Sequence, residues 1–136
     1  MIAIYIHVPF CKQACHYCNF HFSTNLSGKS LFVKALLAEI NLRKDEFPGQ
    51  EIASIYLGGG TPSLLDASEL KEIFNTLKST FIISPDAEIT LEANPDDINA
   101  SLLSVWKENT INRLSLGIQT FHAEALTWMN RAHDNK

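Results

Sequence analysis

The 136-residue sequence contains only three cysteines, and all three fall within eight residues near its start. An odd number of cysteines cannot pair completely within one chain, so a disulfide framework is disfavoured. Basic residues are also not in excess, because 11 Lys and Arg stand against 15 Asp and Glu and the net charge is −4. This charge gives no reason to expect a nucleic acid as a partner.

Long apolar runs are missing as well. No stretch approaches the roughly 20 apolar residues of a membrane-spanning helix, so we predict no membrane span. The apolar start of the chain has no basic leader and is interrupted by His7 and Pro9, which is unlike a signal peptide. We therefore predict a cytoplasmic protein, in which the reducing environment keeps cysteines free to act as metal ligands.

Four short segments with alternating aliphatic and polar residues are separated by helical patterns. Strand–helix alternation predicts a parallel sheet. A sheet covered on both faces would have strands that are apolar throughout, whereas each of these has one polar face. We therefore predict an α/β fold, an incomplete (β/α) barrel of about four parallel βα units, rather than a flat sheet. The expected strands are Ile2–Val8, Ile52–Leu57, Ala87–Glu92 and Asn112–Ile118.

The expected helices fill the gaps between these strands. The first is expected to begin at Ser27 or Ser30 and to end near Glu46. Residues 66–69 predict a capping box at the start of the second helix, and Ser84–Pro85 are expected to separate that helix from the third strand. A short third helix follows, and a last one starts near residue 121. The buried side chains are expected to include Phe32, Ala35, Leu36, Ile40, Trp106 and Trp128.

The three cysteines directly follow the first expected strand, in the pattern Cys-x₃-Cys-x₂-Cys. Three thiolates this close suit three irons of a [4Fe–4S] cluster, and the fourth iron would stay open because such clusters usually take four cysteines. An open iron indicates chemistry with an external ligand. The alternative is a structural zinc site, although such sites usually use two separated ligand pairs and no second pair exists here. Its fourth ligand would be His7, His16 or His21.

Further polar residues follow the other expected strands at the same end. In barrels of this kind the functional site lies at the carboxyl ends of the strands. Gly58–Gly60 follow the second strand, Glu92 ends the third and Gln119 follows the fourth. A triple glycine serves either as a flexible connection or for close approach of the backbone to a ligand. The carboxylate of Glu92 could receive ribose hydroxyls or an ammonium group, and the other strand ends would complete one rim.

Five segments in fixed order resemble the radical-SAM family of oxygen-independent coproporphyrinogen III oxidases and their heme-chaperone relatives. They are Tyr5-Ile-His-Val-Pro-Phe-Cys11, Cys15-His-Tyr-Cys18, Gly58-Gly-Gly-Thr-Pro-Ser63, Leu91-Glu-Ala-Asn-Pro95 and Arg113-Leu-Ser-Leu-Gly-Ile-Gln119. The resemblance implies that a [4Fe–4S] cluster is held by Cys11, Cys15 and Cys18. It also implies that S-adenosylmethionine binds the open iron and contacts Tyr5, Tyr17, Gly59, Gly60, Thr61, Glu92, Gln119 and Arg131.

Two departures from the family pattern refine this expectation. The oxidases carry a further cysteine two positions after the third, where this chain has Phe20; this favours the heme-chaperone branch, for which S-adenosylmethionine cleavage is expected and oxidase activity is doubtful. The family is also longer, so residues 1–136 are expected to be the truncated amino-terminal part of a radical-SAM core domain. Heme would bind through the missing part, and the implied partners are heme or porphyrinogen, an electron donor and a heme-accepting protein. A genuine oxidase and a non-catalytic Cys₃His zinc-binding interaction module remain alternatives.

Overall fold

The structure is a computed structural model and describes residues 2–134. In this part of the chain four parallel strands form one sheet in the order β1-β2-β3-β4, which confirms the predicted parallel βα arrangement. The strands are β1 (Ile2–Val8), β2 (Glu51–Gly59), β3 (Ile82–Ala93) and β4 (Arg113–Leu116). The helices are α1 (Lys29–Leu42), α2 (Ala67–Thr80), α3 (Ala100–Glu108) and α4 (Ala123–Trp128).

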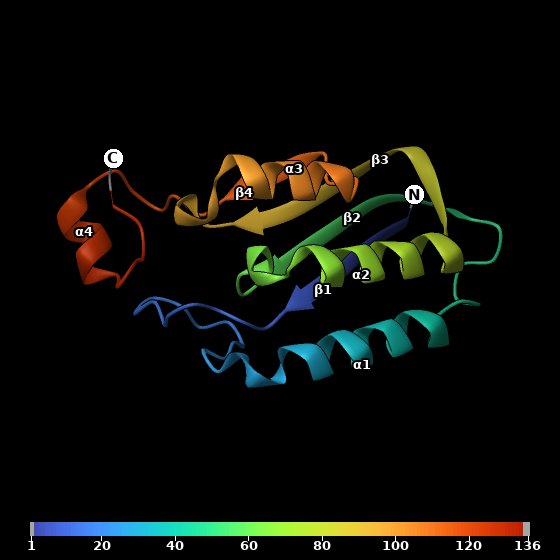
Figure 1. Ribbon diagram of the computed structural model, residues 1–136, viewed down its shortest axis with the longest axis horizontal. Coiled ribbons are helices and arrows are strands. Elements are labelled where there is room, and N and C mark those ends of the chain that lie inside the picture. Colours follow the sequence, from blue (N-terminus) through green and yellow to red (C-terminus); the bar gives the residue numbers. More distant parts are fainter. Residues whose placement is uncertain (1, 135–136) are drawn as a thin grey trace.

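Helices α1, α2 and α3 run alongside the sheet, whereas α4 lies beyond the ends of the strands (Figure 1). All strand arrows point toward the end of the molecule that holds α4 and the loop after β1 (Figure 1). Three single turns of 3₁₀-helix sit near that end of the sheet or precede α1. They are Leu26–Gly28, Pro62–Leu64 and Pro95–Asp97.

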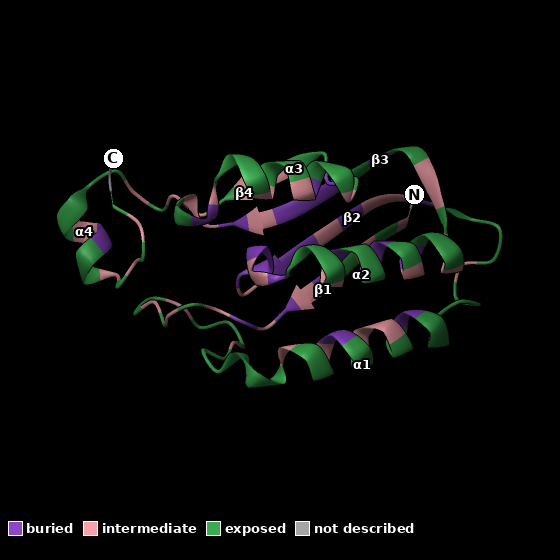
Figure 2. Ribbon diagram, in the orientation of Figure 1, coloured by how far each residue is buried: buried purple, intermediate pink, exposed green. Residues whose placement is uncertain are grey.

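The aliphatic side chains of the sheet are buried on one face, as the alternating sequence pattern predicts. Ile6 and Val8 of β1 are buried, whereas Tyr5, which precedes Ile6 and lies on the opposite face of the strand, is 59% exposed. The helices complete the core with their apolar sides, and the exposed sides face outward (Figure 2). Burial of an aliphatic side chain stabilises the fold by about 1.5–3 kcal/mol, so this one-sided core determines which face of the sheet remains available. The buried residues of α2 are Leu70, Ile73, Phe74 and Leu77.

The first helix differs from the prediction. It starts at Lys29, and its cap is Gly28, which makes no side-chain capping bond, so neither expected serine caps α1. Asn25 caps the preceding 3₁₀ turn instead, where its side chain accepts a hydrogen bond from the Ser27 N–H. The helix ends at Leu42 because the following residues form turns, in which Arg43 pairs with Glu46 at 3.0 Å. Val33 rather than Ala35 is buried on its inner side.

The third strand is longer than predicted. Ser84–Pro85 lie within β3, whereas we expected them to separate the second helix from this strand. Proline cannot donate to a ladder and is tolerated in a strand at a bulge. The β2–β3 pairing is irregular at this point: Ile83 pairs with Ile52, and the next pair is Glu88 with Ser54. The capping box of α2 is confirmed, since Asp66 and Glu69 each accept from the other's backbone.

Two expectations at the carboxyl end of the chain are also wrong. Trp128 is 71% exposed on the short helix α4, although Trp106 is buried as predicted. Strand β4 ends at Leu116, because Gly117 and Gln119 turn the chain away from the sheet. Among the described residues, no helix is long and apolar enough to cross a membrane.

Candidate functional site

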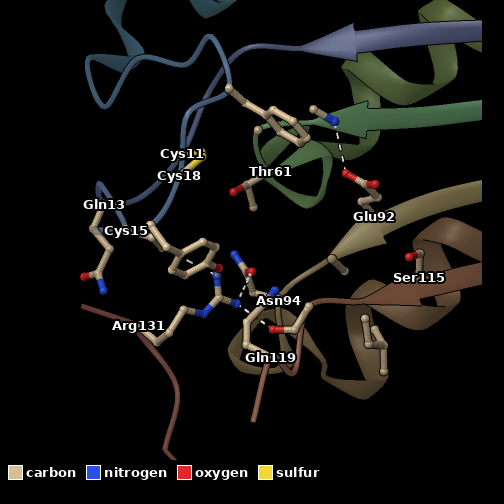
Figure 3. Close-up of a pocket in the computed structure, with 17 residues that line it drawn as sticks. Cys11, Gln13, Cys15, Cys18, Thr61, Glu92, Asn94, Ser115, Gln119 and Arg131 are labelled. Carbon is tan, nitrogen blue, oxygen red and sulfur yellow. Dashed lines mark hydrogen bonds between the residues drawn. The ribbon is translucent and has the colours of Figure 1, made fainter. Parts of the chain in front are cut away.

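A cavity of about 390 Å³ opens at the carboxyl ends of the strands. Its walls come from the loop after β1, the β2–α2 connection, the ends of β3 and β4, and the segments before and after α4 (Figure 3). This volume lies in the range of about 300–1,000 Å³ typical of small-molecule sites. The predicted site residues that line it are Cys11, Cys15, Tyr17, Cys18, Gly59, Gly60, Thr61, Glu92, Gln119 and Arg131.

The three cysteines are half-buried and unpaired, and all face this cavity. Burial raises the pKa of the Cys11 thiol; a hydrogen bond with Thr61 opposes this, and the neighbouring Cys18 and Cys15 raise it further. Metal binding deprotonates a coordinating thiol outright. The three cysteines could therefore bind a metal centre as thiolates, and Cys11 would release a proton on binding.

Backbone hydrogen bonds fix the cysteine loop from two sides. On the sheet side, the Gly60 N–H donates to the Val8 carbonyl at 2.9 Å and the Thr61 N–H donates to the Phe10 carbonyl at 2.6 Å. On the α4 side, the His16 N–H donates to the Met129 carbonyl at 3.1 Å. These contacts join segments more than 40 residues apart in the sequence, so the position of the thiols depends on the whole rim.

The glycine run is closely packed against the protein itself. A side chain on Gly60 would place its Cβ 2.6 Å from the Phe10 carbonyl oxygen and 2.7 Å from that of Val8. At Gly59, where φ is +106°, a Cβ would come within 2.4 Å of the His7 ring. Glycine is thus required where this run crosses the end of β1 and the loop that follows. The glycine run is therefore more than a flexible connection.

Glu92 is held at the cavity wall by two donors. The Tyr56 hydroxyl donates to Oε1 at 2.7 Å, and the Gly59 N–H donates to Oε2 at 3.0 Å. The hydrogen bond to Glu92, followed by burial, raises the pKa of Tyr56, so the tyrosine stays protonated as the donor. An ionised carboxylate has about four acceptor positions, and Glu92 therefore retains capacity for ligand donors.

Arg131 connects the cysteine loop to the opposite wall of the cavity. Its Nη2 donates to Asn94 Oδ1 at 2.7 Å and to the Gly117 carbonyl at 2.6 Å. Its Nη1 lies 3.5 Å from Cys15 Sγ and 3.3 Å from the Tyr17 hydroxyl. Within residues 2–134, its Nε is buried without a hydrogen-bond partner. The guanidinium therefore joins the loop of the cysteines to the segments that hold Asn94 and Gly117.

Tyr5 is the predicted site residue that does not line the cavity. It lies on the polar face of β1, with its hydroxyl 3.1 Å from His7 Nδ1 and its ring 6.1 Å from that of Tyr56. Burial and the negative charge of Glu92 raise its pKa. Tyr5 thus contacts His7 and Tyr56 rather than the cavity itself. Its direct contact with a ligand stays a prediction.

Two of the three histidines considered as zinc ligands, His7 and His16, contact backbone carbonyls through their rings. His7 Nε2 lies 3.1 Å from the His21 carbonyl oxygen, and His16 Nδ1 lies 2.7 Å from that of Trp128. In the part of the chain that the structure describes, no three His, Cys, Asp or Glu side chains converge closely enough to hold a single metal ion. His7 and His16 thus each use a ring nitrogen for a contact within the protein.

A partly buried ion pair that we did not predict from the sequence supports the cysteine loop. Asp97 is 5% exposed; it accepts from the Ser63 hydroxyl at 2.5 Å and from the Asn94 N–H at 3.3 Å, and it pairs with Lys12. Lys12 also contacts Asp96 at 2.8 Å. Lys12 and Asp97 are 85 positions apart, so only the fold brings them together. Other lining residues that we did not predict are Gln13, Phe20, Ala93, Asn94, Ser115, Leu116 and Gly117.

Replacing Lys12 by methionine is expected to lower the free energy of unfolding by about 1–3 kcal/mol. Removing one partner of a buried pair costs about 3–5 kcal/mol, and the effect is smaller here because the Lys12 side chain is 39% exposed and that of Asp97 only 4%. Burial alone would lower the pKa of Lys12, but its hydrogen bonds to Asp96 and Asp97 raise it overall. Urea denaturation of the metal-free protein measures the change. Lys34→Met, at an exposed position of α1, is the control, and equal stability of the two variants would contradict the expectation.

Comparisons with known proteins extend these observations. Residues 5–136 match the model of the Radical SAM superfamily. The heme chaperone HemW of Buchnera aphidicola from Schizaphis graminum is 36% identical over 99% of the chain and 36% of its own length. HemW of Escherichia coli is 35% identical over 97% of the chain and 35% of its own length. The oxygen-independent coproporphyrinogen III oxidase of Escherichia coli is 31% identical over 99% of the chain and 30% of its own length.

A solved structure leads to the same family. The coproporphyrinogen III oxidase HemN of Escherichia coli, described as a radical SAM enzyme, superposes with a TM-score of 0.90 and 31% identity. The match covers 98% of this chain and 31% of HemN, so the chain spans about a third of the length of the relatives it matches. The parallel sheet, the residues at its carboxyl edge and the family match agree. The chain belongs to the radical SAM superfamily, whose members use a [4Fe–4S] cluster and S-adenosylmethionine.

Proposed function

We propose that Cys11, Cys15 and Cys18 hold a [4Fe–4S] cluster and that S-adenosylmethionine binds its fourth iron in the rim cavity. The observation that carries this proposal is that three unpaired thiols, a carboxylate and an arginine line one cavity. When bound, the cluster supplies the electron that cleaves the sulfonium of S-adenosylmethionine. Residues 1–136 would form the amino-terminal part of the radical-SAM core domain of a longer protein.

The protein side chains would bind and orient the cofactor. Glu92, with acceptor positions left beside its two donors, would receive the ribose hydroxyls or the ammonium group. Arg131 and Gln119 would contact the carboxylate and the adenosine part. The place of Arg131 in the cavity lining supports its share of this role. The remaining proposed contacts are Tyr5, Tyr17, Gly59, Gly60 and Thr61.

Metal analysis after anaerobic purification tests the cluster. Iron and acid-labile sulfide should each be near four per chain, as a cubane cluster requires. The alternative of a different class, a non-catalytic zinc-binding interaction module, requires one zinc and no sulfide. That second result would overturn the proposal.

We further propose that the complete protein acts in heme metabolism as a cytoplasmic heme chaperone. Two curated relatives with this name are 36% and 35% identical, compared with 31% for the oxidase. Phe20, which lines the cavity and is 63% exposed, stands where the oxidases have a further cysteine and cannot ligate a metal. Heme would bind through the part of the protein beyond this chain and pass to an acceptor protein, and a separate donor would reduce the cluster.

A genuine oxidase is the second candidate, and the TM-score of 0.90 with HemN favours it. An anaerobic assay of the complete protein with reductant, S-adenosylmethionine and coproporphyrinogen III separates the two. A chaperone should bind heme and leave coproporphyrinogen III unchanged. Turnover to protoporphyrinogen IX would contradict the chaperone proposal and would leave the cluster and cofactor sites unaffected.

A further inference from the structure

Gln119 occupies a strained turn at the cavity wall. Its φ is +63°, and the Thr120 N–H donates to the Ile118 carbonyl at 2.7 Å across it. A hydrogen bond that spans a single residue of positive φ defines the rarer and more strained form of the γ-turn. Residues with a Cβ seldom adopt such a conformation, and strained backbone that persists at a functional site is held there by its surroundings.

The strained turn places the Gln119 side chain at the cavity. Gln119 is among the lining residues, and Figure 3 shows it beside Arg131 and Asn94. A Cβ added to Gly117 would lie 3.3 Å from Gln119 Nε2 and 3.3 Å from Arg131 Nη2. The amide of Gln119 thus packs over Gly117, close to the guanidinium. A relaxed, negative φ at residue 119 would redirect this side chain away from its present place.

The segment after α4 holds the two carbonyl groups that precede Gln119. Arg131 Nη2 donates to the Gly117 carbonyl at 2.6 Å, and His133 Nε2 lies 3.1 Å from the Ile118 carbonyl oxygen. Because a carbonyl only accepts, Nε2 of His133 carries the proton and donates. The same Ile118 carbonyl accepts from Thr120 within the turn, so His133 fixes the group on which the strained turn is built.

We propose that His133 is a positioning residue for the cofactor: its Nε2–H holds the Ile118 carbonyl and so keeps Gln119 in the turn that presents its amide to the cavity. This inference rests on the proposed function, in which S-adenosylmethionine occupies that cavity. His133 does not line the cavity itself. Its effect on cofactor binding should therefore pass through Gln119 and leave the cysteines unaffected.

The test compares two amide substitutions of His133 in the cluster-loaded protein. The amide nitrogen of glutamine can reach the place of Nε2, whereas that of asparagine is too short, so His133→Gln keeps the donor and His133→Asn loses it. With one hydrogen bond lost, His133→Asn should bind S-adenosylmethionine about tenfold more weakly, and His133→Gln should bind close to wild type. Calorimetric titration gives the affinities, and iron analysis should show full cluster content in both variants.

A double-mutant cycle with Gln119→Ala separates positioning from a general structural role. In the Gln119→Ala background, His133→Asn should change the affinity little, because the side chain that it positions is gone. An unchanged affinity of His133→Asn, an equal loss in both backgrounds, or loss of the cluster in both His133 variants would overturn the inference. A wild-type protein with an intact cluster that fails to bind S-adenosylmethionine would instead contradict the proposed function, and the inference would fall with it.

Discussion

Cys15→Ala is expected to reduce bound iron and acid-labile sulfide from about four each per chain to background. Cys15 is the middle cysteine of the motif and lines the cavity. Its Sγ is 3.5 Å from Arg131 Nη1. With only three cysteines in the chain, no other thiol can replace it. Two remaining ligands leave two irons of a cubane without protein ligands, and we expect the cluster to be lost. Anaerobic reconstitution followed by iron and sulfide analysis measures the effect.

His16→Asn is the matched control for this substitution. His16 lies between the cysteines, and its Nδ1 is 2.7 Å from the Trp128 carbonyl oxygen; asparagine can place an amide donor near the same position. We expect this variant to keep its iron, whereas a zinc site that uses His16 would be weakened. A four-iron cluster with normal absorption in Cys15→Ala would show that the cysteine assignment is wrong.

Gly60→Ala is expected to have the second-largest effect, with loss of both stability and cluster content. The added Cβ would meet three backbone atoms of the strand and loop before the cysteines, at 2.6, 2.7 and 2.9 Å. Backbone cannot rotate away as a side chain can, so β1 and the glycine run must separate. Such overpacking typically costs about 1–3 kcal/mol or more. Here the shift moves Phe10, the residue next to Cys11, and we expect reconstituted iron to fall with the melting temperature.

Gly28→Ala supplies the comparison, because nothing lies within 4 Å of a Cβ placed there. Thermal unfolding and iron content of this variant should match those of the wild-type protein. If Gly60→Ala were also indistinguishable from wild type, the close crossing of the two segments could not be what positions the cysteine loop.

The fold was predictable because its signals are local and repeated. Alternating strands such as Ile2–Val8 revealed one aliphatic and one polar face, and Asp66 with Glu69 indicated the start of α2. The errors arose where a tertiary contact outweighed a local signal. Pro85 lies inside β3 because a bulge against β2 accommodates it. Trp128 is exposed because α4 is a short helix beyond the sheet, although a tryptophan on a helix usually indicates core.

The candidate site was predictable to the extent that its residues end strands. Strand ends gather at one edge of a parallel sheet, so the cysteine loop, Gly59, Glu92 and Gln119 were expected together, and the cavity contains them all. The supporting contacts were not predictable. The pairing of Lys12 with Asp97 and the donation from His133 to the Ile118 carbonyl depend on packing between distant segments, which no spacing in the sequence encodes.

The electron paramagnetic resonance spectrum of the reduced protein, with and without saturating S-adenosylmethionine, tests the central proposal most directly. It reports both on the cluster and on the ligand of its open iron. If Cys11, Cys15 and Cys18 hold a cluster beside the cavity that Glu92 and Arg131 line, the spectrum should be that of a reduced [4Fe–4S] cluster and should change on addition of the cofactor. An unchanged spectrum, with the cluster intact and the protein folded, would contradict the proposal that this cavity brings S-adenosylmethionine to the iron.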